Sequence, residues 1–321
     1  MKVALFLNEL SLSPLAADVA AGRARMSAFL SVVTRVRQVV RSAKPLVHTI
    51  DPIHALPLAA GYSVADWSVG LSRDERLLFL QLATQAPLLE GGRDPQELID
   101  RHLRSECWHD GRSAVGLGAA FAADGLSVSF SSALCWAERV LHVEVDEADE
   151  EVNVTRREAV VRHASVGAHI DAHEPWLREL ERLSVRDGQD LWDRRAELFP
   201  VLDFCKEVRG QLTEFRGGDI ALDGVVKRLV DLQKFFDAWD GASIGPGSLP
   251  TKCTPESGPT LGKYEQQHTF TPPVGPRRVF SWHVRFTPGA GRIFFEGDAA
   301  RKRGIIGCVT KVGLRTVKDP T

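Results

Sequence analysis

The chain has 321 residues, of which 44% are hydrophobic and 26% charged, and its formal net charge is -2. These values are typical of a folded globular protein, exclude extensive disorder and allow two domains. The five cysteines are scattered without a Cys-x-x-Cys pair, which argues against a disulfide framework and a thiolate zinc site. Asn8 and Glu9 interrupt the short N-terminal apolar run, so we expect no signal peptide, no membrane partner and a cytoplasmic location.

The first part of the chain reads as a strand followed by helices. Residues 1–10 contain an apolar run that predicts a strand, and residues 15–43 place apolar side chains at helical spacing. The sequence "SRDE" at 72–75 is a capping box, and "DPQE" at 94–97 combines a capping aspartate with a proline at the first helical position. Both patterns predict the start of a helix.

The pattern changes twice before the C-terminal region. Residues 125–165 contain three apolar segments that predict strands, and residues 174–240 return to helical spacing. The stretch 241–262 is dense in Gly, Pro and Ser, which predicts a linker or a long loop. We therefore expect a regulatory body over 1–240 and a separate small module over 263–321.

Positive charge gathers in the C-terminal region. From residue 251 onward there are 12 Lys and Arg against 5 Asp and Glu, a balance of +7, whereas the preceding residues have a balance of -9. A basic module on an acidic body predicts an anionic partner, with RNA or DNA as the leading candidate. The alternative is that the two halves attract each other.

The C-terminal module is predicted to be a three-stranded antiparallel meander. In "VFSWHVRFT" (279–287), alternation places Phe280 and Val284 on a buried face, and His283 and Arg285 on an open one. "RIFFE" and "GIIGCVTK" follow as two further strands joined by a charged turn. Further cations that we expect to contact nucleic acid are Arg301, Lys302, Arg303, Lys311 and Arg315.

The open face of this meander carries a candidate catalytic set. Ribonucleases that use the 2′-hydroxyl as a nucleophile need a base, an acid and cations around the reacting phosphate. His283, Arg285 and Arg292 would supply these groups. The alternative is a histidine that only hydrogen-bonds across strands, beside arginines that bind an anion without chemistry. The glutamate and serine of "TPES" (254–257) could reach the same place in space, but a turn is the simpler explanation of these residues.

The pattern Arg285, Arg292, Ile293 and Phe295, followed by an apolar strand around Ile305, resembles the last three strands of the RelE/ParE toxin superfamily. Helices near 192–216 and 221–240 would correspond to the helical hairpin of that family. The resemblance implies a small basic sheet that acts on RNA at the ribosome or, in the ParE branch, on gyrase. The ribonucleases of the family often use a tyrosine near the C-terminus.

This chain departs from the family at that tyrosine. Its tyrosines are Tyr62 and Tyr264, so none follows the last strand, and His283 would have to take an acid–base role. The long acidic N-terminal part is also foreign to free-standing toxins. A sensor fused to an effector is typical of prokaryotic stress and anti-phage systems, in which the N-terminal body or a regulatory protein would control the toxin-like module.

A second candidate site lies in "HASVGAHIDAH" (163–173), where His163, His169, Asp171 and His173 would form the metal site of a hydrolase. His169 and His173 share a face if the segment is helical, but Ile170 stands where a metalloprotease needs a glutamate. No Walker A or dinucleotide fingerprint is present, so we expect no cofactor.

The sequence thus predicts an α+β protein with a mixed N-terminal body and a small C-terminal antiparallel sheet preceded by helices. Its predicted function is that of an RNA-directed, toxin-like effector, with metal-independent RNA cleavage as the expected activity. The alternatives are a non-catalytic module that binds nucleic acid or protein, and the metal-dependent hydrolase.

Overall fold

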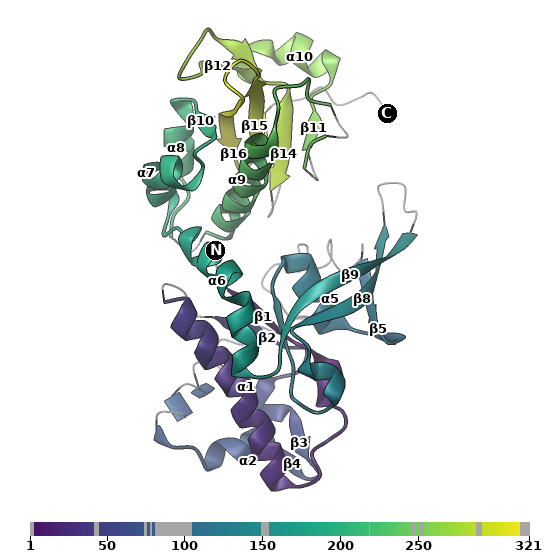
Figure 1. Cartoon of the computed structure of the whole chain (residues 1–321). Coiled ribbons are helices and arrows are strands. Elements are labelled where there is room, and N and C mark those ends of the chain that lie inside the picture. The colour runs from purple at the N-terminus through teal and green to yellow at the C-terminus, as the bar shows by residue number, and fades with distance from the viewer. Residues whose placement is uncertain are drawn as a thin grey trace. The chain divides into compact units, whose positions relative to one another are not determined.

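The computed structural model divides into two compact units, Lys2–Ser184 and Val185–Thr321, and the expected α+β class is confirmed (Figure 1). The residues that the structure describes are 3–41, 45–73, 76–77, 79–80, 105–148, 154–217, 219–245, 248–250, 253–286 and 291–314. The capping box expected at 72–75 extends beyond these residues, and the helix start at 94–97 lies wholly outside them.

The N-terminal unit is built on a mixed sheet with the strand order β2-β1-β7-β9-β8-β5-β6. Strands β2, β1, β7 and β9 run parallel, whereas β8 and β5 continue the sheet in antiparallel pairs. The bounds of its strands are β1 Ala4–Leu7, β2 Leu46–His48, β5 Ser105–His109, β6 Arg112–Ser113, β7 Leu126–Val128, β8 Val140–Ala148 and β9 Val154–Ala164. A separate hairpin consists of β3 Pro57–Ala59 and β4 Tyr62–Ser63. The strands expected at 1–10 and 125–165 are confirmed.

Helices of the N-terminal unit complete its core. Helix α1 begins after Asp18, whose carboxylate accepts a 2.7 Å hydrogen bond from the Ala21 amide, and it buries a face that includes Met26 and Val33. Helix α5 packs on β1, β5 and β9, where Leu117 and Trp136 join the main apolar cluster. The bounds are α1 Val19–Val39, α2 Val64–Val69, α5 Val115–Ala123 and α6 Glu174–Arg182, with short 3-10 segments η1 Glu9–Leu12, η2 Ile53–Ala55, η3 Leu134–Ala137 and η4 Gly167–His173.

The C-terminal unit contains a five-stranded sheet with the order β10-β16-β15-β14-β11. Strands β14, β15 and β16 form the antiparallel meander that the sequence predicts, β11 pairs antiparallel with β14, and β10 pairs parallel with β16. The bounds are β10 Leu202–Phe204, β11 Cys253–Pro255, β14 Trp282–Phe286, β15 Gly291–Asp298 and β16 Arg303–Thr310. A small ladder joins β12 Thr269–Phe270 to β13 Arg278–Val279.

Helix α9 is part of the same unit as this sheet. It packs on β14, β15 and β16 (Figure 1). The Phe236 ring meets the Phe295 ring there at a centroid distance of 6.1 Å. The helical bounds are α7 Gly188–Leu198, α8 Glu207–Thr213, α9 Ile220–Ala238 and α10 Gly258–Tyr264, with the 3-10 segment η5 Glu265–His268. The division therefore lies between Ser184 and Val185 rather than in 241–262, because the meander needs α9 to cover its apolar face.

Two short strands were not expected from the sequence. Strand β10 interrupts the helix expected near 192–216, because Pro200 ends the preceding helical run and Leu202 to Phe204 pair with β16 instead. Strand β11 lies in the segment predicted as a linker, where Thr254 pairs with His283. The helical hairpin implied by the RelE/ParE resemblance is therefore broken in its first half. Among the described helices, none is both long and apolar enough to cross a membrane.

The contact between α7 and α8 predicts a strict requirement for glycine at position 188. A Cβ atom on Gly188 would lie 1.7 Å from the Leu212 carbonyl oxygen, whereas a Cβ on Gly210 in α8 would meet no atom within 4 Å. We expect Gly188→Ala to lower the free energy of unfolding by about 3 kcal/mol, through overpacking against backbone. Gly210→Ala should raise it by up to about 1 kcal/mol, through helix propensity. Urea titration of the two variants measures both effects, and equal stabilities would contradict this packing.

Candidate functional site

The strand register brings the three predicted catalytic residues to one face of the C-terminal sheet. Arg285 of β14 lies directly opposite Arg292 of β15, and His283 lies opposite Phe294. Thr254 of β11 lies opposite His283 on the other side of β14. Because paired residues share a face and side chains alternate along a strand, Thr254, His283, Arg285 and Arg292 all project from the same side.

His283 is buried, contrary to the open position that its alternation pattern predicts. The residue is 4% exposed, and both of its ring nitrogens have close polar neighbours. The Nε2 atom lies 3.0 Å from the Thr254 hydroxyl, and the Nδ1 atom lies 3.0 Å from Glu256 Oε1. The Phe294 ring lies against the imidazole at a centroid distance of 5.5 Å. The prediction was wrong because Glu256, which follows β11, and His268 of η5 lie on this face, and sequence alternation on β14 carries no signal of either residue.

Local geometry fixes Glu256 beside His283. Strand β11 ends at Pro255, but the Glu256 amide still donates a 2.7 Å hydrogen bond to the Ser281 carbonyl and prolongs the pairing with β14. Ser257 then caps α10 by accepting from the Thr260 amide. The chain is thus held on both sides of Glu256, and its side chain is 5% exposed. Glu256 is the glutamate of the "TPES" segment, now placed in the site.

The charge of Glu256 is compensated by groups from three different elements. Burial tends to raise the pKa of its carboxyl, but the contact with His283 and the charges of His283, His268 and Arg292 outweigh burial, so this pKa lies below its ordinary value. The Arg292 guanidinium is 4.0 Å from Glu256 Oε1. The Nδ1 and Oε1 atoms lie at ion-pair distance but not in a well-aligned hydrogen bond, so their attraction is mainly electrostatic. The cluster can hold a carboxylate and a histidine side by side.

The two arginines leave positive charge on the surface of the site. Arg285 is exposed, and no carboxylate pairs with it in the part of the chain that the structure describes. The Arg292 side chain is 20% exposed, and its one ion-pair contact among the described residues is the long one to Glu256. Like charges directly opposite each other on neighbouring strands repel, so the pair is costly unless an anion joins it. This arrangement suits a phosphate or another anion.

Most of the other predicted nucleic-acid contacts are engaged by carboxylates of the chain itself. Arg301 and Arg303 both pair with Asp203, at 2.6 and 2.9 Å, and Lys311 pairs with Asp219 at 2.6 Å. Lys302 is exposed and forms no ion pair within the described ranges. Arg315 lies outside the described residues. The cationic platform expected from the sequence is therefore reduced mainly to Arg285 and Arg292, with Lys302 at a separate turn.

The residues of the alternative metal site each have other partners. His163 is fully buried, with Nε2 2.7 Å from the Ser129 hydroxyl and Nδ1 2.6 Å from the Glu138 carbonyl. His173 Nε2 contacts two backbone carbonyls, and His169 Nδ1 accepts from the Ser165 amide. Asp171 binds the Arg35 guanidinium. Among the described residues, no group of three or more His, Cys, Asp or Glu side chains is placed to hold a metal ion.

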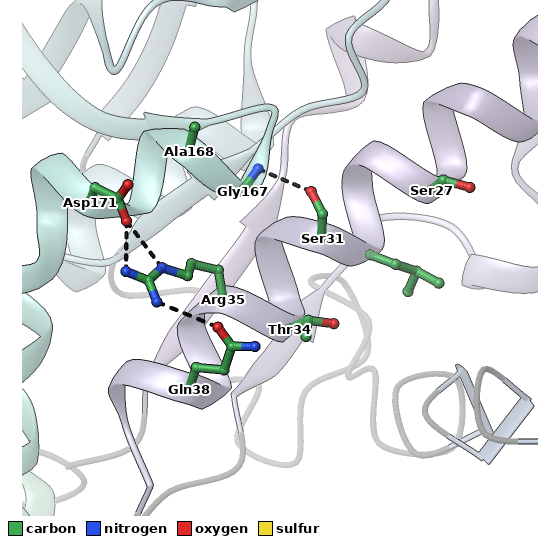
Figure 2. A pocket seen from close by; sticks show the side chains of 9 residues that line it. Ser27, Ser31, Thr34, Arg35, Gln38, Gly167, Ala168 and Asp171 are labelled. Carbon is green, nitrogen blue, oxygen red and sulfur yellow. Dashed lines mark hydrogen bonds and ion pairs between the residues drawn. The ribbon is translucent and has the colours of Figure 1, made fainter.

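One groove belongs to the N-terminal unit and contains none of the predicted catalytic residues. It has a volume of about 530 Å³ and lies between α1 and η4 (Figure 2). Figure 2 shows the Ser31 hydroxyl facing the Gly167 amide, and Arg35 reaching Asp171 and Gln38. Because Asp171 neutralises Arg35, the groove carries no strong charge that would select an anion.

Comparisons with protein-family models, with curated proteins and with solved structures found no match for this chain.

The burial of His163 predicts that acid destabilises the N-terminal unit. Burial lowers the pKa of His163 from 6.5 to about 4, so the unfolded chain binds a proton between these values that the folded chain does not. The contribution of His163 to stability is therefore fully present above its pKa in the unfolded chain, and it is lost as the pH falls toward its pKa in the folded chain. This group alone should cost about 2 kcal/mol between about pH 7 and about pH 5, a difference that urea titration measures.

A His163→Gln variant separates this contribution from those of other histidines. Its stability is expected to be lower at neutral pH, because the hydrogen bonds of the imidazole are lost, but to depend less steeply on pH. An unchanged pH dependence in the variant would contradict the assignment to His163.

Proposed function

We propose that the C-terminal unit acts on RNA as a metal-independent, toxin-like endoribonuclease. The observation that carries this proposal is the shared face of His283, Arg285 and Arg292, where the histidine is held by Thr254 and Glu256 and Arg285 has no carboxylate partner among the described residues. No other group of predicted catalytic residues in the described chain combines a base with cations that remain available to an anion.

The chemistry follows from these residue types. His283 is the base that ultimately takes up the proton of the 2′-hydroxyl of a nucleotide. The 2′-oxygen attacks the adjacent phosphorus, while the bond from phosphorus to the 5′-oxygen breaks. The leaving oxygen takes a proton from water, and the product is a cyclic phosphate. Arg285 and Arg292 would bind the phosphate and stabilise the additional negative charge of the transition state. No metal ion is required for any of these steps.

A second candidate function is RNA binding without cleavage. The 4% exposure of His283 favours it, because a buried imidazole cannot touch a substrate directly. In this alternative Arg285 and Arg292 bind phosphates, and the Thr254, His283 and Glu256 cluster only stabilises the sheet. The two functions differ in one observable, which is whether RNA is cut.

The proposal includes a cellular role. An effector that cleaves RNA, joined to an acidic N-terminal unit, fits a prokaryotic stress or anti-phage defence system in the cytoplasm, with the ribosome as the place of action. The N-terminal unit or a regulatory protein would then restrain the effector until a signal arrives.

The proposal predicts RNA cleavage by the full chain in the presence of EDTA. We expect His283→Ala to lower the cleavage rate by about 100-fold or more, because a general base contributes that much, with little change in RNA affinity. Gel analysis of a labelled RNA measures the rate, and a 2′-deoxy substitution at the cut site should block the reaction. If the wild-type chain binds RNA and never cuts it, the second function is correct.

The arginine pair predicts a salt-dependent interaction with RNA. Arg285→Ala and Arg292→Ala should each reduce the slope of log affinity against log salt by about 1, because each removes a phosphate contact. Lys302→Ala is the matched control, since it removes an exposed cation from a different turn of the same unit. Fluorescence anisotropy measures these slopes. Equal losses in all three variants would show a diffuse attraction rather than a site.

A further inference from the structure

The burial of His283 raises a question that the proposed function leaves open. With both ring nitrogens engaged and 4% of the residue exposed, the imidazole has no free atom for a substrate hydroxyl. A base in this position needs an intermediary that contacts the imidazole on one side and the substrate on the other. Thr254 has this position, because its hydroxyl is 3.0 Å from His283 Nε2 and its strand β11 is the edge of the sheet.

We infer that Thr254, His283 and Glu256 form a proton relay, in which Thr254 exchanges the proton with the substrate and Glu256 positions His283. This inference rests on the proposed function, and it assigns roles to two residues that the catalytic set predicted from the sequence does not contain. The relay consists of Thr254 from β11, His283 from the neighbouring strand β14, and Glu256, which directly follows β11.

The direction of the relay follows from the donors and acceptors. An ionised carboxylate only accepts hydrogen, and the contacts of Glu256 keep its pKa below the ordinary value. The His283 ring and the Glu256 carboxylate attract each other when Nδ1 carries the hydrogen. The Nε2 atom then presents its lone pair to the Thr254 hydroxyl. The Thr254 hydroxyl donates to Nε2 and keeps its own lone pairs for a hydroxyl of the substrate.

The proton balance of the step is closed. The 2′-hydroxyl gives its proton to Thr254 Oγ1 as the Thr254 hydrogen passes to His283 Nε2, and the 2′-oxygen forms the bond to phosphorus. The bond to the 5′-oxygen breaks, and that oxygen is protonated by water. The resulting hydroxide takes the proton back from His283 through Thr254, which restores the relay. Glu256, 3.0 Å from Nδ1, stabilises the imidazolium that results. The carboxylate itself is faced by His283 of β14, His268 of η5 and Arg292 of β15.

The low exposure of Glu256 indicates that it positions His283 and does not contact the substrate itself. Its side chain is 5% exposed, so it cannot reach a polymer, whereas Thr254 is only partly buried. A carboxylate held this way fixes the orientation and the hydrogen position of the imidazole. Burying these polar groups without a use would cost stability that an apolar set of the same shape avoids.

The experiment compares Thr254→Ser and Thr254→Val in the full chain. Thr254→Ser keeps the hydroxyl and should retain cleavage to within about threefold, whereas Thr254→Val should lower kcat by about 100-fold with little change in KM. Thr269→Val is the matched control, since its hydroxyl donates to the Glu265 carbonyl and belongs to the same unit. Circular dichroism checks that each variant is folded, and if Thr254→Val is not, Thr254→Ala takes its place.

Glu256→Gln tests the positioning role with readouts that mere stability would not change. Without the carboxylate the imidazolium is less favourable, so the acid limb of the pH–rate profile should move to lower pH. Nitrogen NMR of labelled histidine should show Nδ1 protonated and Nε2 free in the wild type, and a mixture of the two forms in the variant. Glu296→Gln, which changes a carboxylate bonded to Ser281, should alter neither readout.

The outcomes distinguish the relay from the proposed function. If the wild-type chain cuts RNA and Thr254→Val cuts it equally well, the relay is wrong and the ribonuclease proposal stands. If the wild-type chain cuts no RNA, both fail. Cleavage that is lost in Thr254→Val, kept in Thr254→Ser and shifted in pH by Glu256→Gln supports the relay.

Discussion

The site depends on the pairing of one short edge strand, β11, with β14. This pairing sets Thr254 opposite His283, and its continuation through the Glu256 amide sets a carboxylate at the second ring nitrogen. An imidazole buried without partners would be costly, and each of its nitrogens therefore needs the neighbour that this pairing supplies. Without β11 and the residue that follows it, neither ring nitrogen of His283 would have its present polar neighbour.

Several cations of the C-terminal unit are likewise neutralised by carboxylates of the same unit. The excess of Lys and Arg from residue 251 onward does not form a continuous basic surface. Asp203 and Asp219, from an earlier part of the sequence, form ion pairs with three of these cations and neutralise them. Arg285 and Arg292 differ because they face each other across two strands. A charge count along the chain located the basic region, and only the fold selected the cations that remain available within the described residues.

The sequence predicted the elements whose signal is local. Alternation identified the three strands of the meander, and helical spacing identified α1 and α9, because each of these buries one regular face. Strand β10 was hidden because its three residues continue a helical apolar pattern, and their pairing with β16 is a contact over about a hundred residues of chain. Strand β11 was hidden because Gly, Pro and Ser around it are also typical of linkers. The burial of His283 was unpredictable for the same reason, since its cover comes from a distant segment.

Two of the buried histidines, His163 and His283, differ in the group that faces their Nδ1 atom. His163 Nδ1 faces the Glu138 carbonyl, and burial lowers the pKa of its ring to about 4, so protonation there is strongly opposed. His283 Nδ1 faces a carboxylate instead, and a full negative charge stabilises the imidazolium that acid–base catalysis must form transiently. The Glu138 carbonyl favours the protonated ring of His163, but burial outweighs it. The proposed relay uses the different surroundings of His283, which has a carboxylate at one ring nitrogen and the Thr254 hydroxyl at the other.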